Sequence, residues 1–105
     1  MIARIWTGFT RTSDQDTYFR YLEETGLKDY ASIPGNRGVW VLRRVHEGRA
    51  EFTLISLWES WDAIKAFAGP EYEKAVYYPE DKKFLLELDP NVRHYEVMAS
   101  PVAQS

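Results

Sequence analysis

The segment from Glu51 to Phe67, EFTLISLWESWDAIKAF, constrains the fold more than any other part of the sequence. Its first half is a run of β-branched and aromatic residues that ends at Trp58, which predicts a strand. Its second half begins at Ser60 and places Ile64 and Phe67 at helical spacing, which predicts a helix. A strand therefore leads directly into a helix, and small-molecule sites are often built where a strand end feeds a helix N-terminus.

Three other segments carry the pattern of strands. They are residues 2–9, 39–45 and 92–98, in which β-branched and aromatic residues are frequent. A short polar turn that contains Gly48 separates residues 39–45 from the strand that begins near Ala50. Two strands this close in the chain indicate an antiparallel hairpin.

Helical patterns lie between these strands. A first helix is expected over residues 12–25, with Tyr18 and Leu22 on its apolar stripe and Gly26 as its C-terminal stop. Residues 27–38 contain proline and several glycines, and we expect them to form a connection with tight turns.

The helix that begins at Ser60 is expected to end where Gly69-Pro70 interrupts it. Residues 71–76 are expected to resume as one or two helical turns, and a further short helix is expected from Pro79. The resulting order is strand, helix, strand, strand, helix, strand. This order predicts an α+β ferredoxin-like βαββαβ fold, in which helices cover one face of a four-stranded antiparallel sheet.

We expect a single domain over residues 1–98 and a frayed tail over residues 99–105. The strands place apolar side chains at both parities, most clearly in residues 2–9 and 52–57. The helices cover only one face, so the other face needs a second cover. A second copy of the same sheet is the simplest one, and the sequence therefore predicts a homodimer with sheet-to-sheet packing, a dimeric α/β barrel.

Charge and composition exclude several kinds of function. A net charge of −3 and a pI near 5.4 give no reason to expect nucleic acid or an anionic membrane as a partner. The chain contains no cysteine, which excludes disulfides and thiolate chemistry and favours a reducing compartment. No signal peptide pattern and no run long enough for a bilayer is present, so a cytoplasmic location is expected.

Three stretches resemble the antibiotic biosynthesis monooxygenase family, and the likeness spans the chain to about Met98. They are MIARIW at the start, TGLKDYASIPGNRGVWVLRR in the middle, and TLISLWESWDAIKAFAG across the strand-to-helix unit. The most specific parts are the Pro-Gly-Asn turn and the Trp-Glu-Ser step that is followed by Phe67.

This resemblance implies a ferredoxin-like protomer, a sheet-to-sheet dimer and a pocket between sheet and helices. Known members include oxygenases that act on polycyclic phenols without a cofactor, and haem-degrading enzymes. The family's tryptophan at the end of the third strand corresponds to Trp58. The haem-degrading branch also uses an asparagine on the first strand and a histidine near the second helix, and this chain has neither.

Arg4 and His94 are the candidate catalytic residues. His94 lies on the last strand and Arg4 on the first, and these strands are neighbours in a ferredoxin-like sheet. If both face one cavity, the imidazole accepts the proton of a phenol while the guanidinium stabilises the phenolate. The alternative is that His94 is a structural residue of the strand.

Aromatic residues supply the candidate substrate-binding positions. Trp58 either stacks on a flat aromatic ligand or closes the core between sheet and helix, and these two roles overlap in a small domain. The tyrosines after the Gly69-Pro70 break either roof the pocket or belong to the surface. The full candidate set is Trp6, Trp58, Phe67, Tyr72, Tyr77 and Tyr78.

Two functional hypotheses follow. The first is a small monooxygenase without metal or flavin that acts on a phenolic or quinol substrate. The second is a non-catalytic dimer that binds a small apolar ligand or has a structural role, with haem binding as a weaker option. The two histidines are far apart in the sequence, so no metal site is expected.

Overall fold

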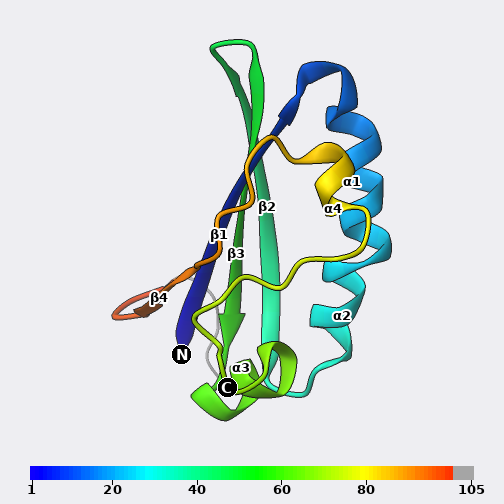
Figure 1. The fold of residues 1–105 in the computed structure, drawn as a ribbon. Coiled ribbons are helices and arrows are strands. Elements are labelled where there is room, and N and C mark those ends of the chain that lie inside the picture. The colour runs from blue at the N-terminus through cyan, green and yellow to red at the C-terminus, as the bar shows by residue number, and fades with distance from the viewer. Residues whose placement is uncertain (101–105) are drawn as a thin grey trace.

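The structure is a computed structural model, and it describes residues 1–100. Two α-helices follow the first strand, a hairpin comes next, and two short helices precede the last strand (Figure 1). The elements are β1 (Ile2–Arg11), a 3₁₀ turn (Thr12–Asp14), α1 (Gln15–Glu24), α2 (Gly26–Ser32), β2 (Asn36–His46), β3 (Arg49–Trp58), α3 (Trp61–Ala68), α4 (Asp81–Phe84) and β4 (Arg93–Glu96).

The four strands form one antiparallel sheet in the order β2-β3-β1-β4. This order confirms the predicted ferredoxin-like α+β fold, because the two central strands are the first and third along the chain. Helices α1 and α2 lie along one side of the sheet, and the segment between α3 and α4 runs between them and the sheet in the view of Figure 1.

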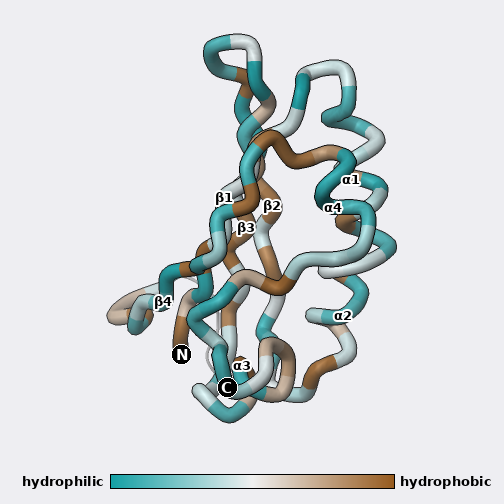
Figure 2. Tube along the Cα trace, viewed as in Figure 1, coloured by the Kyte–Doolittle hydropathy of each residue, from teal (hydrophilic) through white to brown (hydrophobic). Residues whose placement is uncertain are grey.

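The core lies between the sheet and these helices. In β3, Phe52, Leu54 and Trp58 alternate toward this face and are buried. From α1, Tyr18 and Leu22 pack against them, which matches the apolar stripe expected from the sequence. Figure 2 shows the same division, with hydrophobic residues concentrated in the strands and hydrophilic ones at the hairpin tip.

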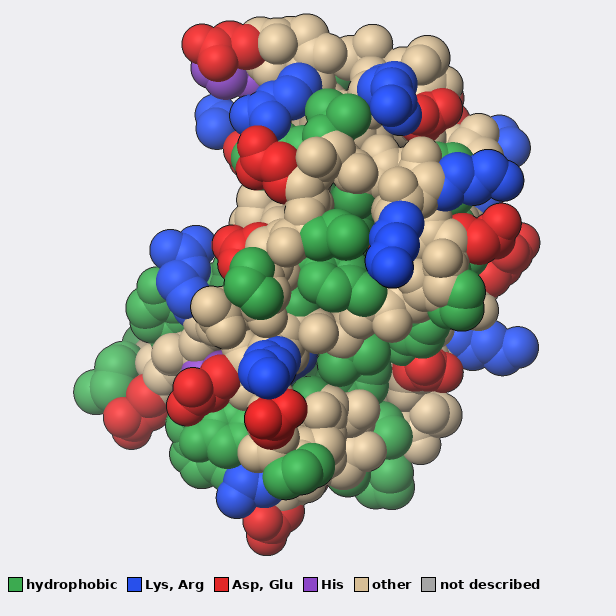
Figure 3. Space-filling model, viewed as in Figure 1, with side chains coloured by type: hydrophobic (Ala, Val, Ile, Leu, Met, Phe, Trp, Pro, Cys, Tyr) green, Lys and Arg blue, Asp and Glu red, His purple; other side chains and the backbone are tan. Residues whose placement is uncertain are grey.

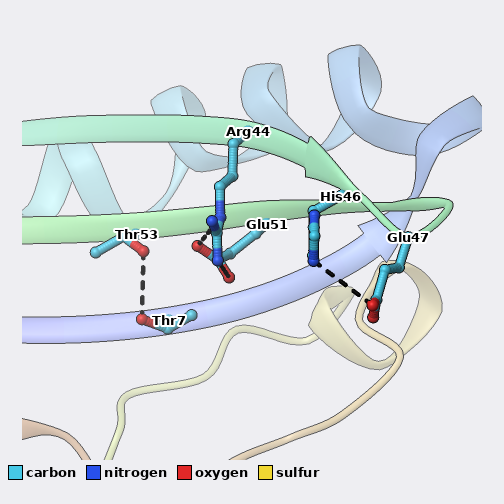
Figure 4. A network of polar contacts seen from close by, with 6 residues as sticks. All are labelled: Thr7, Arg44, His46, Glu47, Glu51 and Thr53. Atoms are coloured by element: carbon cyan, nitrogen blue, oxygen red, sulfur yellow. Dashed lines mark hydrogen bonds and ion pairs between the residues drawn. The ribbon is translucent and has the colours of Figure 1, made fainter.

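The opposite face of the sheet is open over much of its area in the protomer, although Ala3 and Leu57 on this face are buried. The register aligns Trp40, Ile55 and Ile5 in one row across β2, β3 and β1. Trp40 is 46% exposed, and Leu42 and Tyr95 on the same face are also exposed. Figure 4 shows polar contacts on this face, including the hydroxyls of Thr7 and Thr53 and the Arg44–Glu51 ion pair.

The β2–β3 hairpin and the start of α3 form as predicted. Glu47 and Gly48 both have positive φ, 52° and 75°, which is the backbone of the tight two-residue turns that suit twisted hairpins. At α3, the Ser60 side chain accepts a hydrogen bond from the backbone N–H of Ala63 at 3.2 Å. This N-cap begins the helix, and Gly69-Pro70 ends it.

Two helix predictions are wrong. Gly26 does not end the helical region, because α1 stops at Glu24 and α2 begins at Gly26 and continues to Ser32. The predicted connection over residues 27–38 is therefore helical in its first half, and its tight turn is confined to Pro34 and Gly35. The helix persists because Tyr30 is buried against Trp58 and Phe67, which outweighs the local signal of Gly26.

Residues 71–76 do not form the predicted helical turns. The segment from 69 to 80, which we call the strap, is mostly irregular, with a single β-bridge between Lys74 and Asn91. Its backbone makes one local bond, from Lys74 N–H to Glu71 O at 3.0 Å, and two bonds to the segment before β4. Ala75 N–H donates to Pro90 O, and Val92 N–H donates to Glu73 O, each at 2.9 Å. These long-range hydrogen bonds replace the local ones that a helix would make.

Residues 101–105 lie outside the described part of the chain, and so does most of the predicted tail. Within residues 1–100, no helix combines the length and apolar character needed to cross a membrane.

Candidate functional site

A small cavity lies between the sheet, α1, α2 and the strap. Its volume is about 30 Å³, which is room for about one or two water molecules. Most of the lining side chains are apolar or aromatic, and two are ionisable groups of opposite sign. They are Arg4, Trp6, Tyr18, Leu22, Gly26, Tyr30, Leu54, Phe67, Val76, Tyr77, Tyr78, Asp81 and Val92.

Arg4 is a buried cation on β1 that is only 3% exposed. Its Nη1 donates to the carbonyl oxygen of Tyr72 at 2.5 Å and its Nη2 to that of Lys74 at 3.0 Å. Within residues 1–100, no carboxylate pairs with this guanidinium. Burial lowers the pKa of Arg4, but a guanidinium stays charged at neutral pH. The cavity lining therefore carries a positive charge that has no counterion among residues 1–100.

His94 contacts Arg4 across the β1–β4 pair. The Nη1 of Arg4 lies 3.1 Å from the Nε2 of His94, so Nε2 accepts and the neutral imidazole carries its proton on Nδ1. Burial, and then the charge of Arg4, lower the pKa of His94 to about 4. In this arrangement the basic nitrogen of His94 is already occupied, and His94 itself is not part of the cavity lining.

Aromatic rings form one wall of the cavity. Phe67 of α3 lies beneath the guanidinium, with its ring centre 5.7 Å from the Cζ of Arg4. Tyr30 packs on Phe67 at 4.6 Å between ring centres. Trp58 is fully buried and stacks on the far side of Phe67 at 5.6 Å, with its indole N–H bonded to the Ser56 hydroxyl. Trp58 thus supports the wall from behind, outside the lining.

The strap contributes Tyr77 and Tyr78 to the lining. The hydroxyl of Tyr77 accepts from the indole N–H of Trp6 at 3.3 Å and donates to the carbonyl of Asp89. The hydroxyl of Tyr78 donates to Asp29 of α2 at 2.5 Å. Burial raises the pKa of both phenols, so both remain protonated donors at neutral pH.

Asp81 and Tyr18 are site residues that the sequence reasoning did not select. Asp81 begins α4, is only 4% exposed and lines the cavity. One carboxylate oxygen accepts from the Tyr18 hydroxyl at 3.2 Å, and the other accepts from the backbone N–H of Tyr78 at 2.6 Å. Burial raises the pKa of Asp81 despite these bonds. Nothing local in the sequence signals this, because Tyr18 and Asp81 are 63 positions apart.

Tyr72 and His94 belong to a separate surface groove outside the cavity. Together with Trp61 they form a cluster of rings with centres 5.3 to 5.6 Å apart. The groove has a volume of about 400 Å³ and also includes Glu73. Arg4 lines the cavity and His94 lines the groove, so their contact joins the two. The candidate site residues predicted from the sequence are therefore divided between the cavity and the groove.

Charged side chains on the outer surface are mixed in sign. Acidic and basic groups are interspersed over the face shown in Figure 3, without a large field of one sign. Residues 1–100 contain no group of three or more histidine and acidic side chains placed to hold a metal ion.

The chain matches no family model and no curated protein. Among solved structures, a protein from Bacillus cereus described as a putative antibiotic biosynthesis monooxygenase is similar to it, with a TM-score of 0.60 and 19% sequence identity. The match covers 99% of this chain and 96% of that one. At this identity the likeness establishes the shared fold alone.

Proposed function

We propose that this protein is a monooxygenase that needs neither metal nor flavin and acts on a small phenolic or quinol substrate. The observation that carries the proposal is the buried Arg4 cation, which lines an aromatic cavity and has no carboxylate partner in residues 1–100. An isolated buried charge is costly, and an anionic ligand would offset that cost. A phenolate or enolate supplies both the negative charge and a flat ring for the walls formed by Trp6 and Phe67.

In this reaction, loss of a proton from the phenol or enol leaves an electron-rich carbanion in resonance with the oxyanion. The carbanion transfers one electron to dioxygen, and the resulting radical pair combines to form a carbon–oxygen bond in a peroxide anion. This anion takes back the proton that the substrate lost and becomes a hydroperoxide. Loss of water then leaves a carbonyl. One oxygen atom of dioxygen enters the product and the other leaves as water, with the substrate as the source of all electrons.

Arg4 has the electrostatic role in this proposal, since a buried cation stabilises an oxyanion more strongly than a cation in water does. His94 keeps the guanidinium in place through its Nε2. Tyr77 and Tyr78 are part of the aromatic lining, with their hydroxyl protons engaged by Asp89 and Asp29, whereas Tyr72 and Trp58 act indirectly, from the groove and through Phe67.

Ligand entry requires the strap to move. A cavity of about 30 Å³ cannot hold a phenol ring, and ligand pockets for small organic molecules start near about 300 Å³. The strap is fastened at Tyr72 and Lys74 by Arg4, so an anionic ligand that competes for the guanidinium also releases the strap. Substrate binding and opening are thereby coupled through one side chain.

We propose further that the active form is a cytoplasmic homodimer that packs sheet to sheet. The uncovered row of Trp40, Ile55 and Ile5 supports this assembly, because exposed apolar rows of this kind mark interaction sites. The absence of cysteine supports a reducing compartment.

The second candidate is a ligand-binding dimer without turnover. The small volume of the cavity, about 30 Å³, favours it, since a tightly packed interior suits a structural role. Haem binding is the weakest option, because His94 has its Nε2 occupied by Arg4 and a cavity of about 30 Å³ is far smaller than a porphyrin.

Oxygen consumption tests the proposal. Chelator-treated protein is incubated with hydroquinones of one to three rings, and the initial rate is compared with that of Arg4→Met and of Arg43→Met, an exposed arginine paired with Asp16. The proposal expects uptake that Arg43→Met retains and Arg4→Met loses. Saturable binding without uptake would favour the second candidate, and neither binding nor uptake across the panel would exclude both.

A further inference from the structure

The cavity lining contains a buried carboxyl group, that of Asp81, in addition to the Arg4 guanidinium. Asp81 lies toward the other end of β1. The residues that follow α4 pair with that end, through the Leu86 N–H to Phe9 O bond of 2.9 Å and the Thr10–Leu85 bridge. Thr10 and Arg4 lie on the same face of β1, and Asp81 comes from the segment that packs near Thr10. Asp81 and Arg4 therefore line one cavity without forming an ion pair within the described residues.

The surroundings of Asp81 hold its carboxylate in one position and leave it able to accept a further hydrogen bond. Tyr18 is almost fully buried, with Phe52 and Phe84 at 5.3 and 5.6 Å from its ring, so its hydroxyl is fixed. The carboxylate accepts one hydrogen bond at each oxygen, whereas an ionised carboxylate has about four acceptor positions. Acceptor capacity is therefore left on a group that faces the cavity.

We propose that Asp81, positioned by Tyr18, is the general base of the cavity and removes the acidic proton of a bound enol or carbon acid. This inference rests on the proposed function, because it assigns the proton-transfer step of that reaction. The bond between carbon or oxygen and hydrogen breaks, the proton moves to a carboxylate oxygen of Asp81, and the electron pair remains on the ligand as an enolate or phenolate. The step consumes no oxidant.

Asp81 is better placed for this step than His94. His94 lies in the surface groove, and its accepting nitrogen is engaged by Arg4. Burial raises the pKa of Asp81, which brings a carboxylate closer to neutral pH, where general bases are efficient. The titratable and charged groups that face Asp81 are Tyr18 of α1, Tyr77 and Tyr78 of the strap and, within the same cavity lining, Arg4 of β1.

Proton transfer can be measured apart from oxygen chemistry. Under nitrogen in deuterium oxide, the probe β-tetralone exchanges its acidic methylene hydrogens when a base removes them, and proton NMR follows the loss of signal. We expect wild-type protein to accelerate this exchange and Asp81→Asn, which preserves the shape of the side chain, to lose about 100-fold or more of the acceleration. Asp29→Asn is the matched control, because Asp29 also bonds a strap tyrosine but lies outside the cavity lining.

A second variant keeps the carboxylate and changes only its environment. Tyr18→Phe removes the hydrogen bond that stabilises the ionised form, so the acid limb of the exchange rate should move to higher pH by about 1 unit. This shift is a signature that a merely structural Asp81 would not produce, and it remains measurable if Asp81→Asn fails to fold.

The outcomes separate the inference from the proposed function. Exchange that depends on Asp81 without any oxygen uptake would overturn the oxygenase but leave the base assigned. Exchange or oxygen uptake that survives in folded Asp81→Asn would overturn the assignment, as would loss of exchange in His94→Gln alone. Wild-type protein that does not accelerate the exchange at all would also overturn it.

Discussion

Arg4 connects the sheet, the strap and the groove through one side chain. Replacing it by methionine removes the hydrogen bonds to two strap carbonyls and leaves those oxygens without their donor, while removing a desolvated charge. We expect the free energy of unfolding to fall by about 1–3 kcal/mol, since unsatisfied buried acceptors cost about this much. Urea titration followed by tryptophan fluorescence measures the change.

The matched control for this variant is Arg43→Met. Arg43 pairs with Asp16 at 3.1 Å on the exposed surface, and such pairs contribute less than about 1 kcal/mol. Equal losses in the two variants would contradict a special structural role for Arg4.

His94 makes the stability of the protein depend on pH. Its pKa is about 4 in the folded chain, against 6.5 for an unperturbed imidazole such as that of the unfolded chain, so the folded state binds fewer protons between these values. The contribution of His94 to stability is therefore complete above about pH 6.5 and is lost as the pH falls through about 4. Unfolding titrations across this window should show a slope that His94→Gln reduces.

The comparison with His94→Gln isolates this effect from that of Asp81. Because burial raises the pKa of Asp81, its contribution runs the other way and is lost as the pH rises above its unfolded value. An unchanged slope in His94→Gln would show that the imidazole does not bind protons differently in the two states.

At the scale of elements, the strap is the part that must move if the proposed function is correct. The Tyr77 hydroxyl joins it to the sheet through Trp6 and to the chain before β4 through Asp89. Tyr77→Phe should lower the free energy of unfolding by about 1–2 kcal/mol, because it leaves the buried indole N–H unpartnered. It should also accelerate hydrogen exchange at the amides of Ala75 and Val92, which fasten the strap.

Tyr72→Phe is the control on the same segment. Its ring packs against Trp61 and His94, but its hydroxyl makes no hydrogen bond within residues 1–100. Removing that hydroxyl should leave both stability and amide exchange nearly unchanged. Equal acceleration in the two variants would indicate that strap opening does not depend on the Tyr77 bridge.

The strap is one of the parts of the fold that could not be predicted from the sequence. Strands β1 and β3 and the start of α3 were predictable, because their signals are local: runs of β-branched and aromatic residues within Ile2–Arg11 and Arg49–Trp58, and a serine cap at Ser60. The strap and α2 were not, because distant contacts decide them. Arg4 fixes the strap across 68 positions of sequence, and the burial of Tyr30 maintains α2 past Gly26.

The candidate site divides in the same way. The proximity of Arg4 and His94 could be anticipated, since neighbouring strands of a ferredoxin-like sheet bring them together. Asp81 could not, because the sequence places it among exposed-looking charged residues, and only the packing of α4 on Tyr18 buries it. The role of a side chain such as Asp81 depends on whether packing buries it, and a single sequence does not predict this.

For the whole molecule, the question to be tested is whether two copies associate through the open face of the sheet. The uncovered face presents Trp40 next to Ile55 and Ile5, and a second copy is its proposed cover. Trp40→Glu introduces a charge at the centre of that face, where burial without a partner is costly, and should convert the dimer into a monomer. Sedimentation velocity at micromolar concentration distinguishes the two states.

Trp61 provides a matched control for this test. It is 44% exposed against 46% for Trp40, but it lies on the helix side of the sheet, in the groove with Tyr72 and His94. Trp61→Glu carries the same change of size and charge, so it should remain a dimer if association uses the open sheet face. Dissociation of both variants would place the interface elsewhere. A monomeric wild-type protein would overturn the proposed barrel, because the barrel consists of two sheets packed face to face.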